Sequence, residues 1–180
     1  VTGGRIHDVE SLPDNPAVVF IASASGGIWK SINKGTTLKP VFDDQAVSTF
    51  GDLAISPSNP NILYAGTGEQ QNRQSTSWGN GIYKSTDQGE SWRSIGLEKT
   101  YHIGRVIIHP RNSKIVYVAA LGNLWKESAE RGVYKTIDGG KSWEKVLFIN
   151  EMTGVVDLAI DKNDPNTVYA ATYQRMRKAW

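Results

Sequence analysis

Ser85-Thr86-Asp87-Gln88-Gly89-Glu90-Ser91-Trp92 is one of three copies of an eight-residue stretch in this chain of 180 residues. The other two copies are Ser31-Ile32-Asn33-Lys34-Gly35-Thr36-Thr37-Leu38 and Thr136-Ile137-Asp138-Gly139-Gly140-Lys141-Ser142-Trp143. The copies begin 54 and 51 residues apart, and a regular period of this order is typical of solenoids, arrays and β-propellers. Such a repeat indicates an architecture but no function, because binding modules and enzymes share repeat folds.

Three further blocks of sequence recur with the eight-residue stretch, and all are short, rich in β-branched or aromatic residues, and bounded by turn formers, as strands are. They occupy residues 8–9, 52–55, 105–108 and 157–160, then 18–23, 62–67, 115–120 and 167–172, and finally 27–30, 81–84 and 132–135. With a strand after the eight-residue stretch, each repeat predicts four antiparallel strands, named A to D in chain order. Four such strands form one blade of a β-propeller.

We therefore predict an all-β chain in which residues 1–180 form a single propeller segment. Its four-stranded antiparallel blades are expected at 4–43, 50–97 and 103–149, with a half blade at 155–180. Three and a half blades cannot close a ring, which normally needs four to eight. The chain is expected either to be part of a longer protein that supplies the remaining blades or to complete a seven-bladed ring with a second copy.

The eight-residue stretch is predicted to be the turn between strands C and D. Asp or Asn side chains accept backbone N–H bonds in such turns, Gly tolerates a positive φ, and a Trp can anchor the hairpin. The residues with this structural role are expected to be Asn33, Gly35, Asp87, Gly89, Trp92, Asp138, Gly140 and Trp143. A cation held by the carboxylates is the less favoured alternative. The first hairpin, with Asn33 and Leu38 in place of Asp and Trp, is expected to be the loosest.

The pattern Ser/Thr-x-Asp-x-Gly-x-Ser/Thr-Trp resembles the Asp-box, or bacterial neuraminidase repeat. This repeat occurs in sialidases, xyloglucanase-type hydrolases, sortilin-like propellers and photosystem II assembly-factor propellers. Residues 24–31, 66–69 and 102–105 are most similar to bacterial exported sortilin-like proteins of the glycosyl-hydrolase type. The resemblance implies a propeller and an extracellular or periplasmic location.

Composition excludes several classes of function. The net charge of +2 is spread along the chain, whereas a nucleic-acid-binding protein would gather Lys and Arg on one face. No apolar run is long enough to span a membrane, and there is no cysteine for disulfides or thiol chemistry. His7, His102 and His109 fall at dissimilar positions of the repeat, so neither a metal site nor a cofactor is predicted.

Strand parity predicts where a ligand would bind. In an up-and-down blade the A–B and C–D turns lie on one face and the B–C and D–A loops on the other. The B–C loops vary in length, and variable loops on a rigid scaffold are the usual place for binding. We predict a glycan or polypeptide ligand on this B–C loop face, contacted by Arg73, Trp78, Asn80, Trp125, Tyr173 and Arg175. The alternative is that the tryptophans only pack the loops against the blades.

A second group of candidates lies where the innermost strands begin. Asp8, Asp52, Arg105 and Asp157 occupy matching positions in the four units, and Arg5 and His102 lie just before two of them. Facing charges around a narrow channel can shift each other's pKa and support acid–base chemistry. Alternatively they form a ring of salt bridges. Arg5, His102 and Arg105 are added to the predicted ligand-binding residues.

A glycosidase needs two carboxylates at a defined separation, and the candidates are Asp8, Asp52, Asp157 and Glu69. Sialidases add an arginine trio and a Tyr/Glu nucleophile, and no such pair is evident here. Xyloglucanase-type enzymes place an Asp two residues before a Gly-Gly pair, where this chain has Ala24 before Gly26-Gly27. We therefore predict a non-catalytic glycan- or polypeptide-binding propeller within a larger exported protein. A glycoside hydrolase, sialidase-like or xyloglucanase-like, is the alternative.

Overall fold

The computed structural model describes residues 5–71 and 75–178. These residues form strands and one short 3-10 helix, η1 (Glu98–Thr100). The strands are β1 (Ile6–Leu12), β2 (Asn15–Ser23), β3 (Ile28–Ser31), β4 (Lys39–Pro40), β5 (Phe50–Ile55), β6 (Leu63–Thr67), β7 (Ile82–Ser85), β8 (Arg93–Ser94), β9 (Ile103–Ile108), β10 (Val116–Ala120), β11 (Gly132–Thr136), β12 (Glu144–Leu147), β13 (Thr153–Ile160) and β14 (Val168–Gln174).

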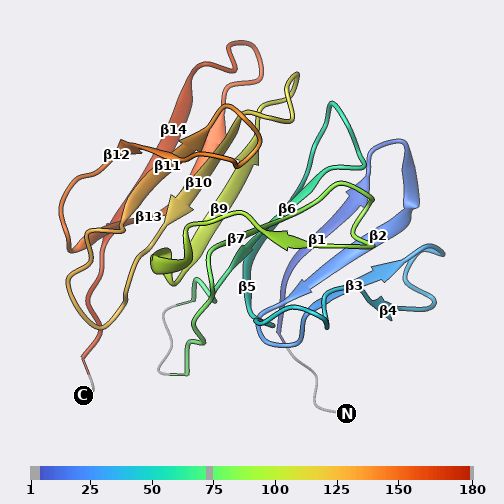
Figure 1. Ribbon diagram of the computed structural model, residues 1–180, viewed down its shortest axis with the longest axis horizontal. Helices are drawn as coiled ribbons and strands as arrows, with labels where there is room; N and C mark the ends of the chain where they lie inside the picture. The colour runs from blue at the N-terminus through green and yellow to red at the C-terminus, as the bar shows by residue number, and fades with distance from the viewer. Residues whose placement is uncertain (1–4, 72–74, 179–180) are drawn as a thin grey trace.

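Within the described residues the strands pair in chain order into four antiparallel sheets. Blade 1 is β1 to β4, blade 2 is β5 to β8, blade 3 is β9 to β12, and a half blade consists of β13 and β14. Figure 1 shows the sheets standing side by side. The predicted all-β propeller segment with three and a half blades is confirmed.

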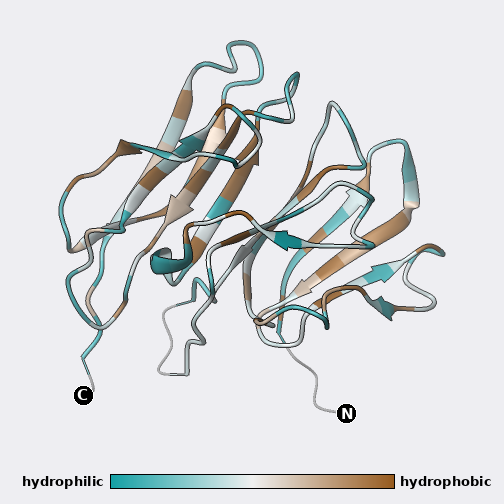
Figure 2. Cartoon of the chain, in the orientation of Figure 1, coloured by the Kyte–Doolittle hydropathy of each residue, from teal (hydrophilic) through white to brown (hydrophobic). Residues whose placement is uncertain are grey.

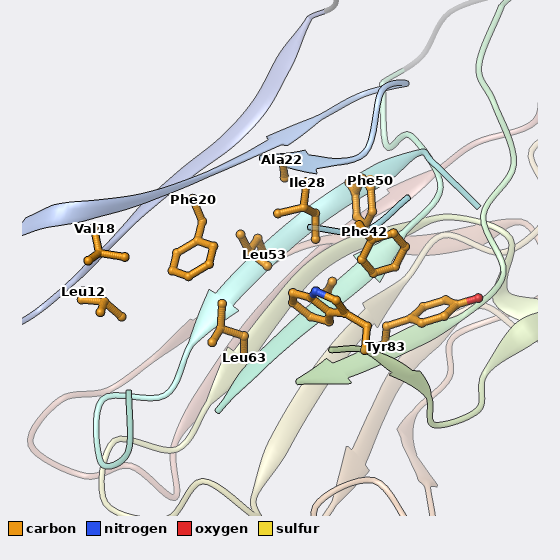
Figure 3. Packing of buried hydrophobic residues seen from close by; sticks show 12 residues of the cluster. Leu12, Val18, Phe20, Ala22, Ile28, Phe42, Phe50, Leu53, Leu63 and Tyr83 are labelled. Atoms are coloured by element: carbon orange, nitrogen blue, oxygen red, sulfur yellow. The ribbon is translucent and has the colours of Figure 1, made fainter. Parts of the chain in front are cut away.

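The hydrophobic core lies between adjacent blades rather than within any one of them. Alternate residues of β2, namely Val18, Phe20 and Ala22, are buried against Leu53 and Leu63 of blade 2. Figure 3 shows these side chains filling the space between the two sheets. Figure 2 shows that apolar colour is concentrated on the longer strands, whereas most turns and the short outer strands β4 and β8 are largely polar.

Aromatic rings lock the first interface. The ring of Phe42, from the connection after blade 1, contacts Phe50, Tyr83 and Trp92 of blade 2 edge-on at centroid separations of 4.8, 5.1 and 5.3 Å. Edge-to-face pairs add to the stabilisation that burial provides. Trp92 thus anchors its hairpin to the neighbouring blade.

Each eight-residue stretch forms the C–D turn through the same set of hydrogen bonds. In blade 2 the Ser85 hydroxyl accepts the backbone N–H of Gly89 (2.8 Å), and the Asp87 carboxylate accepts that of Ser91 (2.9 Å). Gln88 and Gly89 both adopt positive φ, at 57° and 79°. The corresponding bonds recur around Asn33 and Asp138, so Asn replaces Asp here without changing the turn.

The three turns differ in their anchoring residue. Trp92 is buried, and the indole N–H of Trp143 donates to the Ile95 carbonyl of the preceding blade (2.8 Å). Leu38 in the first copy is 45% exposed. The first hairpin therefore has less of its anchor buried, although its looseness stays a prediction.

In blades 1 and 2 a lysine on strand C joins the blade to the C–D turn of the next blade. The Lys30 ammonium donates to the Gln88 carbonyl (2.9 Å), and that of Lys84 donates to the Gly139 carbonyl (3.0 Å). Each ammonium also lies over an aromatic ring of strand B in its own blade, 5.5 Å from Phe20 and 5.1 Å from Tyr64. These paired contacts give a structural reason for the Lys that recurs at the end of the Gly-apolar-aromatic-Lys block.

The innermost strands are bulged where they pass closest to one another. The pairing of β5 with β6 shifts register between Phe50 and Asp52, which makes Gly51 the extra residue. A Cβ atom at Gly51 would lie 1.7 Å from the Ile103 carbonyl oxygen of blade 3. Only glycine fits there, because no side-chain rotation can relieve a clash with backbone.

Gly51→Ala is expected to destabilise the protein by about 3 kcal/mol or more, since blades 2 and 3 must move apart. The free energy of unfolding is measured by urea denaturation, with circular dichroism as the signal that reports unfolding.

Gly35→Ala is the matched control. Gly35 has a φ of 84° but no atom within 4 Å of the added Cβ, so the expected cost is only the strain of a positive φ, about 1 kcal/mol. Equal losses for the two variants would contradict the close approach of the inner strands.

Candidate functional site

The B–C loops and the D–A connections meet on one face of the blade row. In blade 2 the N–H of Gly79 donates to the Tyr101 carbonyl (2.8 Å), and in blade 3 the N–H of Leu121 donates to the His102 carbonyl (2.9 Å). The C–D turns instead bond to the A–B turns, as the Gln88 N–H does to the Asn61 carbonyl. The two kinds of loop are thus separated at opposite ends of the strands.

The four charged residues predicted at the channel form a connected chain between blades. The Asp8 carboxylate accepts the N–H of Leu53 in blade 2 (3.0 Å), and the Asp52 carboxylate accepts that of Val106 in blade 3 (2.7 Å). Each carboxylate therefore joins its own inner strand to that of the following blade.

Arg105 continues this chain with the opposite charge. Its guanidinium donates to Asp52 of the preceding blade (3.2 Å) and to Asp157 of the following half blade (2.8 Å). Asp8 also accepts the N–H of Val9, and Asp157 that of Leu158. The structure thus brings Asp8, Asp52, Arg105 and Asp157 together in a ladder of inter-blade bonds.

Burial changes the protonation of two carboxyls near the axis. Burial raises the pKa of Asp52 to about 8, against the opposing effects of the Val106 N–H and the Arg105 guanidinium. Burial, together with the charge of Asp8, raises the pKa of Glu10 to about 7. Both groups therefore titrate near neutral pH.

Glu69 and Arg5 lie at the mouth of this face and bind each other. The Arg5 guanidinium forms an ion pair with the Glu69 carboxylate. Glu69 is only 1% exposed, whereas the side chain of Arg5 is 40% exposed. Glu69 is therefore a buried counter-ion in this structure rather than an accessible carboxylate.

Trp78 is the aromatic residue most open to solvent on the B–C loops of the described chain. It is 52% exposed, and its ring meets Tyr101 edge-on at 5.1 Å. Its loop is held on both sides, because Ser77 accepts the Glu69 N–H and the Trp78 carbonyl accepts the Thr49 hydroxyl. Tyr101 itself has a φ of 58°, so the ring beneath Trp78 stands on an unusual backbone conformation.

Among the other predicted loop residues, Trp125 and Asn80 are more enclosed than Trp78, whereas Tyr173 is about as exposed. The Trp125 ring packs against the Arg177 guanidinium at 5.5 Å, and the amide of Asn80 donates to the Tyr83 hydroxyl at 3.4 Å. Tyr173 is 50% exposed on β14. Arg73 lies outside the described residues. Trp125 therefore fits the packing alternative better than Trp78 does.

His102 and Arg175 lie beneath the loops rather than on their surface. His102 is fully buried and Arg175 is 4% exposed. Burial, followed by the charges of Arg175 and Arg131, lowers the pKa of His102 to about 4. Arg131, which was not among the predicted site residues, is also fully buried. It precedes Gly132 at the position where the other two copies have Gly26 and Asn80. This change to a charged residue was the signal in the sequence that could have identified it.

Among the described residues there is neither a metal-binding cluster nor a helix that could span a membrane. Residues 5–71 and 75–178 contain no group of three His, Asp or Glu side chains placed to hold a metal ion. Over the same residues, no helix is both long enough and apolar enough to cross a membrane.

The chain is similar to two curated xyloglucanases and to solved structures of GH74 enzymes and of YCF48. No family model matches the chain. A probable oligoxyloglucan-reducing end-specific xyloglucanase of Neosartorya fischeri is 29% identical over 71% of this chain. A xyloglucanase of Hypocrea jecorina is 23% identical over 92% of it. The chain spans only 15% and 20% of the lengths of these two proteins.

Among solved structures, an ancestral GH74 enzyme superposes on 96% of the chain with a TM-score of 0.75 and 23% identity. The GH74 enzyme of Niastella koreensis does so on 94%, with a TM-score of 0.69 and 21% identity. YCF48 of Cyanidioschyzon merolae matches 89% with a TM-score of 0.56 and 14% identity. The chain covers 23%, 26% and 48% of these three proteins respectively. These likenesses support the propeller fold.

The raised pKa of Asp52 predicts a specific pH dependence of stability. The pKa is 3.8 for an ordinary Asp and about 8 in the folded protein, so between these values the folded state holds more protons than the unfolded state. The contribution of Asp52 to the free energy of unfolding therefore falls as the pH rises through this window, by at most about 1.4 kcal/mol per pH unit. Asp52→Asn, which keeps an acceptor for Val106, should remove this slope in chemical denaturation at pH 4 to 8.

Glu10 titrates in the same window, so the quantity to compare is the difference in slope between the two proteins. Asp138→Asn is the contrasting variant: hydrogen bonds from the Ser142 and Thr136 hydroxyls hold the pKa of Asp138 well below its usual range. Its stabilising contribution is present above pH 4 and is lost as the pH falls further. An unchanged slope in Asp52→Asn would refute the assignment.

Proposed function

We propose that this chain is part of a β-propeller that binds a glycan on its B–C loop face and does not itself catalyse hydrolysis. The observation that carries the proposal is Trp78, whose ring is half exposed on a loop fixed by hydrogen bonds and backed by Tyr101. A rigid, exposed aromatic face is suited to stacking on the apolar side of a sugar ring.

The bonding of the carboxylates favours binding over catalysis. Asp8 and Asp52 accept backbone N–H groups of the neighbouring blades, and Asp157 accepts the Arg105 guanidinium. Glu69 is buried against Arg5. A general acid or a nucleophile must reach the substrate, whereas Asp52 and Glu69 are buried and Asp8 and Asp157 are bonded to neighbouring groups of the fold.

The relatives suggest which glycan to test. Two curated proteins similar to this chain are named as xyloglucanases, so a xyloglucan-type oligosaccharide is the first ligand we propose. The three C–D turns resemble the Asp-box. On that resemblance we assign the chain to a larger exported protein of the sortilin-like or glycosyl-hydrolase type, whose further blades complete the ring.

Hydrolysis is the second candidate because of those same relatives. In that case the missing catalytic groups would come from the remaining blades, and the raised pKa of Asp52 would suit a general acid. A panel of aryl glycosides and xyloglucan oligosaccharides tests this function. Turnover by the protein with its remaining blades that disappears in Asp52→Asn would favour the hydrolase and contradict the binding-only proposal.

Trp78→Ala is expected to weaken the binding of xyloglucan oligosaccharides about tenfold or more, because it removes the exposed stacking surface. Isothermal titration calorimetry measures the dissociation constant. Trp78→Phe should retain part of the affinity, since it keeps an aromatic face.

Ile137→Ala is the matched control: this residue is 68% exposed but belongs to a C–D turn at the opposite end of the strands. It should leave the affinity unchanged. Equal affinity of the Trp78→Ala variant and the wild-type protein would refute the loop-face site. Binding of extended peptides but of no glycan would replace the glycan with a polypeptide ligand.

A further inference from the structure

Two arginines far apart in sequence, Arg131 and Arg175, are both buried on the B–C loop side of blade 3 and the half blade. Arg131 directly precedes β11 and is 0% exposed, and Arg175 directly follows β14 and is 4% exposed. The Leu121 N–H donates to the His102 carbonyl, and the next residue, Gly122, lies against the Arg131 side chain. The Leu121 backbone also packs on Gly154 of β13, the strand that pairs with β14 just before Arg175. The three residues therefore come together around one segment of blade 3, and the charges of both arginines lower the pKa of His102.

Each guanidinium has only neutral partners. Arg131 donates through Nη2 to the carbonyls of Asn123 (2.7 Å) and Lys126 (3.5 Å). Arg175 donates through Nη1 to the Gln70 carbonyl of blade 2 (2.8 Å). The salt bridges of the described chain involve Arg5, Lys30, Lys39 and Arg105 as cations, and neither buried arginine is among them.

Several donor atoms of this cluster are left without a partner. They are Nε and Nη1 of Arg131, Nε and Nη2 of Arg175, and both ring nitrogens of His102, one of which carries a proton in the neutral ring. Nε and Nη2 lie on one edge of the Arg175 guanidinium, the fork that binds oxyanions in a bidentate manner.

An uncompensated buried charge is costly, and so is an unmade hydrogen bond at a buried donor. Two such charges next to one another repel each other as well. Burial accordingly lowers the pKa of Arg131, and burial with the charges of Arg177 and Arg131 lowers that of Arg175 to about 10. The cluster has donors and positive charge in excess and lacks the anion that would balance them.

We propose that Arg131, Arg175 and His102 enclose a small monovalent anion, of the size of chloride or formate, between blade 3 and the half blade. The anion accepts hydrogen bonds from Nε and Nη2 of Arg175 and from the donors of Arg131 that have no partner. The ring N–H of neutral His102 donates a further hydrogen bond. The bound anion joins the B–C loops of blades 2 and 3 to the half blade, because Arg175 already holds Gln70. This anion site is independent of glycan binding at Trp78.

The test is thermal unfolding at constant ionic strength, with chloride or formate replacing isethionate, an anion too large for an enclosed site. At saturating chloride or formate the unfolding midpoint should rise by about 5 °C. In Arg175→Gln and Arg131→Gln the rise should be absent. Both variants should lose less stability in isethionate than in chloride, since each also removes an unbalanced charge.

Arg111→Gln is the control, because Arg111 is exposed and lies in an A–B turn at the other end of the strands; it should keep the full response. An equal response in Arg175→Gln and Arg111→Gln would overturn the site, as it would reflect a general salt effect.

A direct measurement does not depend on whether the variants fold. Crystals of the wild-type protein grown in bromide should give an anomalous peak between Arg131 and Arg175. Density at this position with no anomalous signal would mean that only water satisfies these donors, and would overturn the proposal.

Discussion

The close approach of the innermost strands is the constraint on which the rest of the structure depends. Four strands, β1, β5, β9 and β13, converge on one axis, and at Gly51 the backbones are so near that no Cβ fits. Asp8 and Asp52 each follow directly on a bulge in their strand. Each carboxylate accepts a backbone N–H of the next blade. The charges near the axis are thus explained first as links between blades.

The outer parts of the blades repeat a second link. A lysine of strand C lies over an aromatic ring of its own blade and donates to the C–D turn of the next. Between these two links lies an apolar layer that neither blade could bury alone. Blades of this kind stabilise one another in order along the chain, and the two ends of the row carry exposed apolar residues such as Val9 and Tyr169, in line with the proposal that further blades flank them.

The separation of the two loop faces has a functional consequence. On one face, the C–D turns form hydrogen bonds with the A–B turns. Near the axis, the carboxylates form hydrogen bonds that join neighbouring blades. This separation supports our proposal that a ligand binds on the B–C loops, where Trp78 is half exposed. The excess positive charge of Arg131 and Arg175 contrasts with the region near the axis, where Asp52 and Asp157 flank Arg105.

The sequence by itself determined the architecture. The recurring eight-residue stretch and the strand blocks predicted blades, strand order and the separation of loop faces, because turn residues and strand periodicity act locally. The matching positions of Asp8, Asp52, Arg105 and Asp157 also placed these residues near one axis. Their bonding partners were not predictable, because a carboxylate that accepts a backbone N–H some 50 residues away leaves no local pattern.

Burial and exposure on the loop face were decided only by the tertiary structure. Trp78 and Trp125 look alike in sequence, yet one ring is half exposed and the other packs against a guanidinium. Glu69 is a catalytic candidate from its sequence position, but in the structure it is buried in an ion pair with Arg5 of another blade. Arg131, His102 and Arg175 meet only when two blades and three connections pack together. The physical reason is that long loops take their conformation from contacts with neighbouring blades, and those contacts are distant in the chain.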